Sequence, residues 1–171
     1  LVEKNPFVAR YRMLKGNMLR HYKRFDGAEE EFKTGLELDP YNMDLYHYLS
    51  ELYRETGRET ECRETLMRGL QVDPHSRRLL VDLTWQNFRI RQLKAVDTLT
   101  SMILELEETN PSPKDPNFNP EAYAYMYMGL IAERKANLDL AGRHYRKFLD
   151  LAEGLPEIPA IEQKVRKIDS L

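Results

Sequence analysis

The sequence has few of the residues that mark a disulfide scaffold, a membrane span or a nucleic-acid surface. Of its 171 residues only Cys62 is a cysteine, so no disulfide can form within the chain. No apolar run approaches the roughly 20 residues that a membrane-spanning helix needs. Lys and Arg number 26 against 28 Asp and Glu, so no basic excess is available to contact phosphates. We therefore expect no direct membrane insertion and no nucleic-acid partner.

The short motifs of catalytic, cofactor and metal sites are also missing. The eight glycines form neither a phosphate-cradling loop nor the elbow that presents a nucleophilic serine. The four histidines are scattered without the spacing of metal ligands. Cys62 occupies a position of small packing residues, which favours a buried, inert thiol over a nucleophile. The sequence thus predicts a protein that is not an enzyme, with no catalytic residues, no cofactor and no metal.

What the sequence does contain is a repeat. Pro6, Pro40 and Pro74 are evenly spaced, and Gly35 and Gly69 share the same spacing. A period of about 34 residues with two amphipathic helices per unit is typical of stacked helical repeats. Apolar periodicity predicts an all-α protein without strands, whose helices cover residues 7–22, 26–38, 42–55, 59–72, 76–89, 92–108, 120–135, 138–153 and 156–171.

The signature residues resemble those of the tetratricopeptide repeat (TPR) family. Its pattern of aromatic, Leu, Tyr, small, large, small and Pro is matched in the second unit by Tyr46, Leu49, Tyr53, Cys62, Leu66, Gly69 and Pro74. The fourth unit keeps the spacing with Tyr125, Met128, Gly129, Ala141 and Tyr145. The third unit matches only in part. The resemblance implies a right-handed α-solenoid of antiparallel helix pairs whose concave face binds peptide segments of partner proteins.

The repeat phase predicts a single TPR domain over residues 1–171. Its units are expected to be the end of a preceding repeat (1–6), the repeats 7–40, 41–74, 75–108 and 121–153, an insertion loop (109–120) and a C-terminal capping helix (156–171). Four prolines interrupt residues 109–120, and proline cannot continue a helix. Ile158, Ile161, Val165 and Ile168 recur at helical steps, which suits a helix that covers the end of a stack. We expect a cytoplasmic location. Because no initiator methionine is present, the N-terminus is expected to be truncated, which leaves the periplasm or export open.

In TPR proteins the first helix of each pair lines the groove, and the resemblance transfers this role to matching positions. The implied groove residues are Met13, Asn17, Tyr48, Glu51, Arg54, Arg78, Val81, Trp85, Phe88, Tyr123, Met126, Tyr127 and Leu130. Opposite charges nearly cancel along these helices, while the apolar share is large. We therefore expect a ligand segment with apolar anchors and mixed charges, centred on Trp85 and Tyr127. Trp85 is either such an anchor or is buried against the insertion loop.

Some TPR proteins grip a C-terminal carboxylate with a clamp of basic and asparagine side chains. Asn17 matches this clamp and Arg78 is at least basic, whereas Met13, Tyr48 and Asp82 replace its other members. A chaperone-tail ligand is therefore not expected.

We expect a non-catalytic scaffold that binds a partner's peptide segment in its concave groove. The alternative is a regulatory or self-assembly module of a larger multidomain protein whose enzymatic or secretion and assembly activity lies outside this sequence. Homo-oligomerisation is left open.

Overall fold

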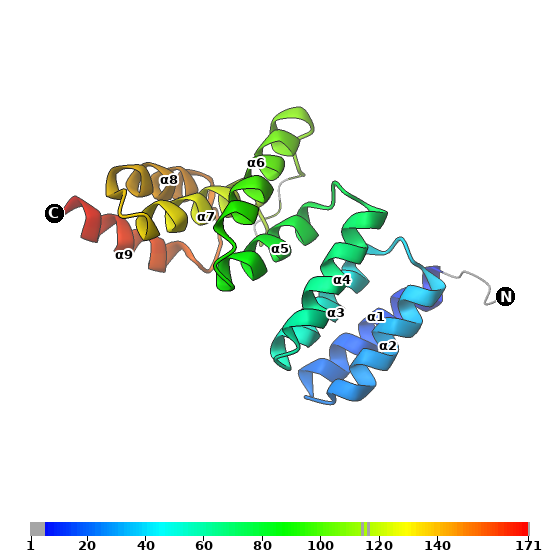
Figure 1. Ribbon diagram of the computed structural model, residues 1–171. Helices are drawn as coiled ribbons and strands as arrows, with labels where there is room; N and C mark the ends of the chain where they lie inside the picture. Colours follow the sequence, from blue (N-terminus) through cyan, green and yellow to red (C-terminus); the bar gives the residue numbers. More distant parts are fainter. Residues whose placement is uncertain (1–5, 114, 116, 171) are drawn as a thin grey trace. The chain divides into compact units, whose positions relative to one another are not determined.

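The computed structural model describes residues 6–113, 115 and 117–170, and this part of the chain is helical without strands (Figure 1). Its nine helices are α1 (Pro6–His21), α2 (Phe25–Leu38), α3 (Met43–Glu55), α4 (Glu59–Val72), α5 (Arg77–Arg89), α6 (Leu93–Thr109), α7 (Pro120–Arg134), α8 (Leu138–Leu151) and α9 (Ile158–Asp169). The all-α helical-repeat prediction is confirmed, and every predicted helix end falls within two residues of the observed one. The predicted end of a preceding repeat, at Leu1–Asn5, lies outside the described residues.

The helices divide into two compact units, Leu1–Leu83 and Thr84–Leu171. The first unit contains α1 to α4 and the first half of α5. The second contains the rest of α5 and α6 to α9. The boundary falls inside α5, and therefore within the predicted third repeat rather than between two repeats. Each unit is described by itself.

Small residues let successive helix pairs of the first unit approach closely. A Cβ atom added to Gly35 of α2 would lie 2.9 Å from Cδ2 of Leu45 on α3, closer than real atoms pack. Gly69 of α4 meets Leu79 of α5 in the same way. Leu45 and Leu79 are both fully buried. Because the second glycine and leucine follow the first pair by one repeat length, one packing contact is used twice.

Each helix pair reverses direction through one residue with left-handed backbone geometry. These residues are Lys23, Gly57, Arg91 and Ala136, with φ angles of 58°, 73°, 60° and 57°. The first three follow one another at the repeat spacing, and the fourth comes after the insertion loop between α6 and α7. Glycine adopts this geometry without strain, whereas side chains with a Cβ atom disfavour it.

A hydrophobic core in the second unit joins α7, α8 and α9. Tyr145 and Phe148 of α8 are fully buried, and Ile161 of α9 is 3% exposed. The Tyr145 hydroxyl donates to Glu133 Oε2 at 2.6 Å, and Lys164 of α9 donates to the same oxygen at 2.7 Å. These bonds fasten α9 to the preceding helix pair.

In the first unit Glu29 of α2 makes polar contacts with the α3–α4 pair, in addition to the packing of Gly35 against Leu45. It accepts hydrogen bonds from Tyr53 Oη of α3 at 2.9 Å and from Arg58 Nη1 at 2.5 Å, and it pairs with Lys33 at 2.7 Å. Burial acts to raise the pKa of this carboxyl, but the hydrogen bonds from Lys33, Arg58 and Tyr53 outweigh it and hold the pKa at about 2. The charged form of Glu29 therefore stabilises the contact between α2 and the α3–α4 pair.

Two opposite substitutions, at Gly57 and at Ala136, test how much the left-handed backbone geometry of these turns affects stability. Gly57→Ala should lower the free energy of unfolding by about 1 kcal/mol, because alanine is strained at a positive φ. Ala136→Gly should raise it by a smaller amount for the same reason. Urea unfolding of both variants measures the difference. Equal effects of the same sign in the two variants would contradict this explanation.

The lowered pKa of Glu29 predicts an acid-dependent stability. Its folded pKa lies below the unfolded value, so its contribution is present above about pH 4.5 and is lost as the pH falls toward 2. Glu29→Gln should remove about 1 kcal/mol of this pH dependence, after allowance for solvent screening. Urea unfolding at pH 7, 4, 3 and 2.5 would measure it. Glu30→Gln, at an exposed neighbouring position, should change stability by less than about 0.5 kcal/mol at every pH.

Candidate functional site

The first helices of the two pairs in the first unit form one continuous surface, which we call the α1–α3 surface. It consists of Asn17 and Arg20 of α1 together with Tyr48, Glu51 and Arg54 of α3, all half-buried. Residues three positions apart are neighbours on a helix surface, so Asn17 lies beside Arg20 on α1, and Glu51 lies between Tyr48 and Arg54 on α3. Contacts between α1 and α3 bring these two faces together.

Glu51 is the electrostatic centre of the α1–α3 surface. Arg20 Nη1 lies 2.6 Å from its Oε2 and Arg54 Nη2 lies 2.5 Å from its Oε1. Burial acts to raise the pKa of Glu51, but the hydrogen bond from Arg20 and the neighbouring charges of His47, Arg20 and Arg54 together lower it. Glu51 is consequently a carboxylate that both arginines hold in place.

The charge network continues onto the first half of α5. His47 Nδ1 lies 2.6 Å from Asp82 Oδ2, and His47 Nε2 lies 3.9 Å from Glu51. Arg20 also pairs with Glu55 at 3.5 Å. Because Arg20 and Arg54 lie beside Glu51, and Arg20 also beside Glu55, the surface presents paired charges rather than a strong field of one sign.

Tyr48 provides a rigid aromatic plane within this network. Its ring stacks on Phe32 of α2 with the centroids 6.1 Å apart and the planes 13° from parallel. The guanidinium carbon of Arg20 lies 5.7 Å from the Tyr48 centroid. A side chain fixed on two sides loses little conformational freedom when a ligand packs against it.

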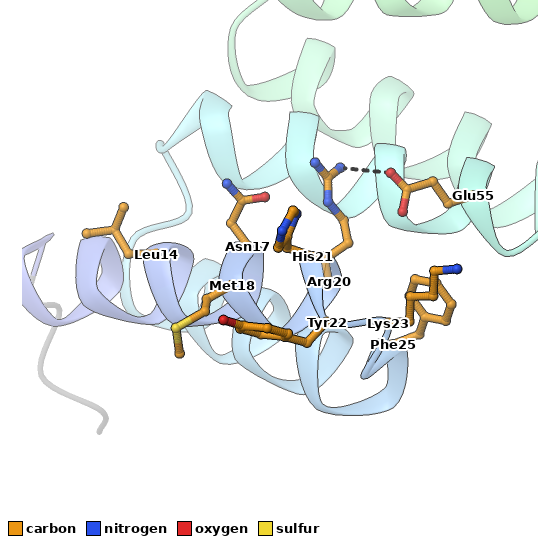
Figure 2. A pocket seen from close by; sticks show the side chains of 9 residues that line it. All are labelled: Leu14, Asn17, Met18, Arg20, His21, Tyr22, Lys23, Phe25 and Glu55. Atoms are coloured by element: carbon orange, nitrogen blue, oxygen red, sulfur yellow. Dashed lines mark ion pairs between the residues drawn. The ribbon is translucent and has the colours of Figure 1, made fainter.

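A hollow of about 630 Å³ opens beside the α1–α3 surface (Figure 2). Figure 2 shows Arg20 and Glu55 reaching toward each other, with Asn17 and His21 nearby on α1. The lining residues of the hollow are Leu14, Asn17, Met18, Arg20, His21, Tyr22, Lys23, Phe25 and Glu55. Four of these nine side chains are apolar or aromatic and five are polar or charged, so the hollow offers both kinds of contact.

The second unit has its own candidate surface, formed by the end of α5 and by α7. Each of these is the first helix of its pair. The rings of Phe88 and Tyr127 are 5.8 Å apart. Arg134 lies over Phe88 with 3.7 Å between the guanidinium carbon and the ring centroid, and it donates to the Phe88 carbonyl at 3.1 Å. Arg89 lies over Trp85 at 4.7 Å. This α5–α7 surface therefore presents aromatic rings flanked by arginines.

The thirteen groove positions implied by the sequence differ in exposure. Ten of them are half-buried. In the first unit these are Met13, Asn17, Tyr48, Glu51, Arg54 and Arg78, and in the second unit they are Trp85, Phe88, Tyr123 and Leu130. Val81, Met126 and Tyr127 are 6%, 7% and 4% exposed. Met126 and Tyr127 belong to the core of the second unit. A ligand can therefore reach Trp85 and Phe88 better than Tyr127.

The groove positions transferred from the TPR pattern leave out part of the hollow. Met18, Tyr22, Lys23 and Phe25 line it, although none of them is among those positions. A signal was present in the sequence, because apolar residues recur along α1 at helical spacing up to Tyr22.

Other kinds of site find little support in the described residues. Within them no group of three or more His, Cys, Asp or Glu side chains is arranged to hold a metal ion. Cys62 is 3% exposed, as its packing position predicts. None of the helices described is both long and apolar enough to cross a membrane.

The repeated helix pairs agree with the result of comparing this sequence with profiles of known protein families. A family profile described as tetratricopeptide repeat matches residues 19–81, which include the α2, α3 and α4 helices. Residues 19–81 carry tetratricopeptide repeats. The resemblance inferred from the signature residues is thereby confirmed. No curated protein is similar enough in sequence to match.

Solved structures share the fold of this chain. A crystal structure of MamA protein superimposes with a TM-score of 0.69 at 22% identity, covering 95% of this chain and 81% of that one. A thermophilic TPR protein of Thermus thermophilus gives 0.63 at 17% identity, with coverages of 94% and 80%. The first TPR of Spaghetti, bound to the HSP90 peptide SRMEEVD, gives 0.62 at 17% identity, with coverages of 80% and 99%. At these identities the likeness concerns the fold, and TPR folds are typically non-catalytic modules for protein–protein interaction.

Proposed function

We propose that this TPR protein is a non-catalytic scaffold that binds a peptide segment of a partner protein along the first helices of its repeats. The observation that carries the proposal is the hollow beside the α1–α3 surface. It combines the apolar side chains of Leu14, Met18, Tyr22 and Phe25 with the polar or charged ones of Asn17, Arg20, His21, Lys23 and Glu55. Such a lining favours an apolar ligand side chain whose backbone or polar atoms meet the rim. The TPR fold itself supports a protein partner.

The charges of the α1–α3 surface favour a ligand of mixed charge. Glu51 is satisfied by Arg20 and Arg54, and Asp82 is satisfied by His47. A strongly charged ligand would have to displace one of these pairs and leave its partner uncompensated. Apolar contact with Tyr48 and the hollow would then supply most of the affinity, because burial of apolar area contributes about 25 cal/mol per Å² before binding costs.

The aromatic residues of the α5–α7 surface offer a second anchor point in the second unit. Trp85 is half-buried, and Arg89 covers part of its ring. Trp and Arg are the residue types that most often dominate binding energy at protein interfaces. Each unit thus contains a candidate surface whose contribution can be tested separately.

A library of displayed random peptides, selected on the immobilised protein, would supply ligands for a titration. We expect the selected peptides to carry apolar anchors and mixed charges. Asn17→Tyr, which fills the hollow, and Trp85→Ala should each weaken the peptides that use their unit by about 2 kcal/mol or more. An increase in salt should weaken binding less than these variants do, because only exposed pairs at the rim are screened.

The control for this experiment is Met67→Ala, which changes an exposed apolar residue of α4 outside both surfaces. It should leave the affinity unchanged, and unfolding curves of all variants should show that they remain folded. Peptides whose binding vanishes in high salt but survives both Asn17→Tyr and Trp85→Ala would contradict the proposed function.

The peptide SRMEEVD, bound by the Spaghetti TPR, provides a contrasting ligand. Its acidic tail would meet Asp82, and Tyr48 and Met13 stand at positions where a carboxylate clamp needs other side chains. We expect it to bind at least about tenfold more weakly than the selected peptides, a difference that fluorescence anisotropy measures directly. Equal affinity would show that this chain binds acidic C-termini after all.

A further inference from the structure

The left-handed turn residues give a common register for the first helices of the repeats. Gly57, Arg91 and Ala136 have positive φ angles in the turns that follow α3, α5 and α7. A position on one of these helices can therefore be compared with the position at the same distance from the turn on the others. This comparison shows which side chains of the first unit change character in the second.

Two carboxylates of the first unit occupy positions that carry no acid in the second. Glu51 and Glu55 stand six and two residues before Gly57, and both pair with Arg20. The same positions hold Trp85 and Arg89 on α5, and Leu130 and Arg134 on α7. The second unit therefore has apolar and basic side chains where the first unit has carboxylates that neutralise an arginine.

Arg134 shows the consequence of this exchange. Its guanidinium carbon lies 3.7 Å from the centroid of the Phe88 ring, and its Nη1 donates to the Phe88 carbonyl oxygen at 3.1 Å. Among the residues that the structure describes, no Asp or Glu forms an ion pair with it. Glu133, the acid beside it in the sequence, is instead bound by Lys164 and Tyr145. Because a guanidinium has five N–H donors in a planar fork, the exposed Arg134 is held in place and can still bind a carboxylate.

Further basic side chains surround Arg134, and we call the group the basic cluster. Arg91 donates its backbone N–H to the same Phe88 carbonyl at 3.2 Å, and Lys94 follows in the first turn of α6. The members of the cluster, all exposed, are Arg91, Lys94, Arg134 and Lys135. In the described part of the chain, the carboxylate that pairs with this cluster is Asp97, 3.5 Å from Lys135. The cluster therefore keeps an excess of positive charge beside the aromatic rings of the α5–α7 surface.

The rest of the chain indicates which kind of anion fits the basic cluster. The whole sequence has a net charge of −2, so a membrane surface or a nucleic acid that extends past the cluster would meet acidic side chains outside it. A short protein segment with a few carboxylates contacts the cluster alone. Planar carboxylates also match the guanidinium fork, and the neighbouring rings of Trp85 and Phe88 favour an apolar side chain in the same segment.

We infer that the peptide segment bound by the α5–α7 surface is acidic, with an aromatic or large aliphatic anchor against Trp85 and Phe88 and with Asp or Glu side chains bound by the basic cluster. This inference rests on the proposed peptide-binding function and adds the charge of the ligand in the second unit. Phe88 follows Trp85 by one helical turn, which is roughly 5 Å along α5. An extended peptide advances about 3.3 Å per residue, so the carboxylates should stand about one to three residues from the anchor.

The displayed random peptides selected on this protein provide the probes. Peptides that Trp85→Ala weakens are assigned to the α5–α7 surface, and peptides that Asn17→Tyr weakens are assigned to the α1–α3 surface. We expect the first group to be enriched in Asp and Glu within about three residues of its apolar anchor. The second group should lack this enrichment, because the arginines of the α1–α3 surface already pair with Glu51 and Glu55.

Charge reversal in the basic cluster should weaken only the first group of peptides. Arg134→Glu should weaken their binding by at least about tenfold and Lys94→Glu by at least about threefold, as measured by fluorescence anisotropy. Lys94→Glu places an acid in the first turn of a helix, where it is favourable, so its effect does not depend on a loss of folding. The matched control is Arg143→Glu, which reverses an exposed charge on α8 of the same unit and should leave every affinity unchanged.

A charge exchange identifies the contact itself. A peptide of the first group whose flanking acid is replaced by lysine should bind the wild-type protein weakly. It should regain at least half of the lost affinity, on a logarithmic scale, with the Arg134→Glu protein. Circular dichroism of each variant would confirm that it is folded.

The outcomes separate this inference from the proposed function. The inference alone is refuted if Trp85-dependent peptides show no acidic enrichment, if they are insensitive to Arg134→Glu and Lys94→Glu, or if Arg143→Glu weakens them equally. It is also refuted alone if only Asn17-dependent peptides are found, whereas a failure to select either group would refute the peptide-binding function as well. Phosphatidylserine vesicles and a short single-stranded DNA are the competing anions. Tighter binding of either one, abolished by Arg134→Glu, would assign the basic cluster to lipid or nucleic acid instead.

Discussion

The close approach of neighbouring helices at residues without bulky side chains is the contact on which the rest of the structure depends. Gly16 faces Phe32 within the first helix pair, and Gly129 faces Tyr145 within the last, where added Cβ atoms would lie 2.6 Å and 2.5 Å from the rings. Gly35 is shared between two neighbours, because it contacts Leu45 of α3 and also lies near the carbonyl of Ala9 on α1. One small residue thus lets α2 pack against α1 and α3 at once, and this brings the faces of α1 and α3 together.

Once α1 and α3 are adjacent, the composition of their shared surface explains its electrostatic character. Arg20 and Glu51 come from different helices, and their side chains are only 16% and 20% exposed. A charge removed from water to that extent is costly unless an opposite charge accompanies it. The pairing of Arg20 and Arg54 with Glu51 meets this requirement, and His47 Nδ1 lies within hydrogen-bonding distance of Asp82 Oδ2. It also fixes Tyr48 and the edge of the hollow, so a ligand would meet a surface that is already ordered.

The two faces of α1 show how identical repeat positions acquire different roles. Leu45 on α3 and Tyr11 on α1 have the same place in the repeat, yet one is fully buried and the other largely exposed. The difference arises from whether a helix of the α2 type packs against them. Glu29 and Arg58 show that such a contact combines apolar packing with a charged pair.

The sequence by itself determined the helices, their order and their repeat phase. Periodicity of apolar residues, the spacing of Pro6, Pro40 and Pro74, and turn residues such as Gly57 act through neighbours within a few positions, so their effect can be read locally. The positions of Asn17, Tyr48 and Glu51 on the first helices followed from the same phase. The exposed fraction of individual side chains could not be predicted from the repeat phase. Tyr127 and Trp85 both fit the groove pattern, but Tyr127 is buried in the core of its unit while Trp85 is half-buried. The network around Glu51 also required the tertiary structure, because burial and ion pairing depend on which distant helix packs against a face, and a repeat phase records only the face itself.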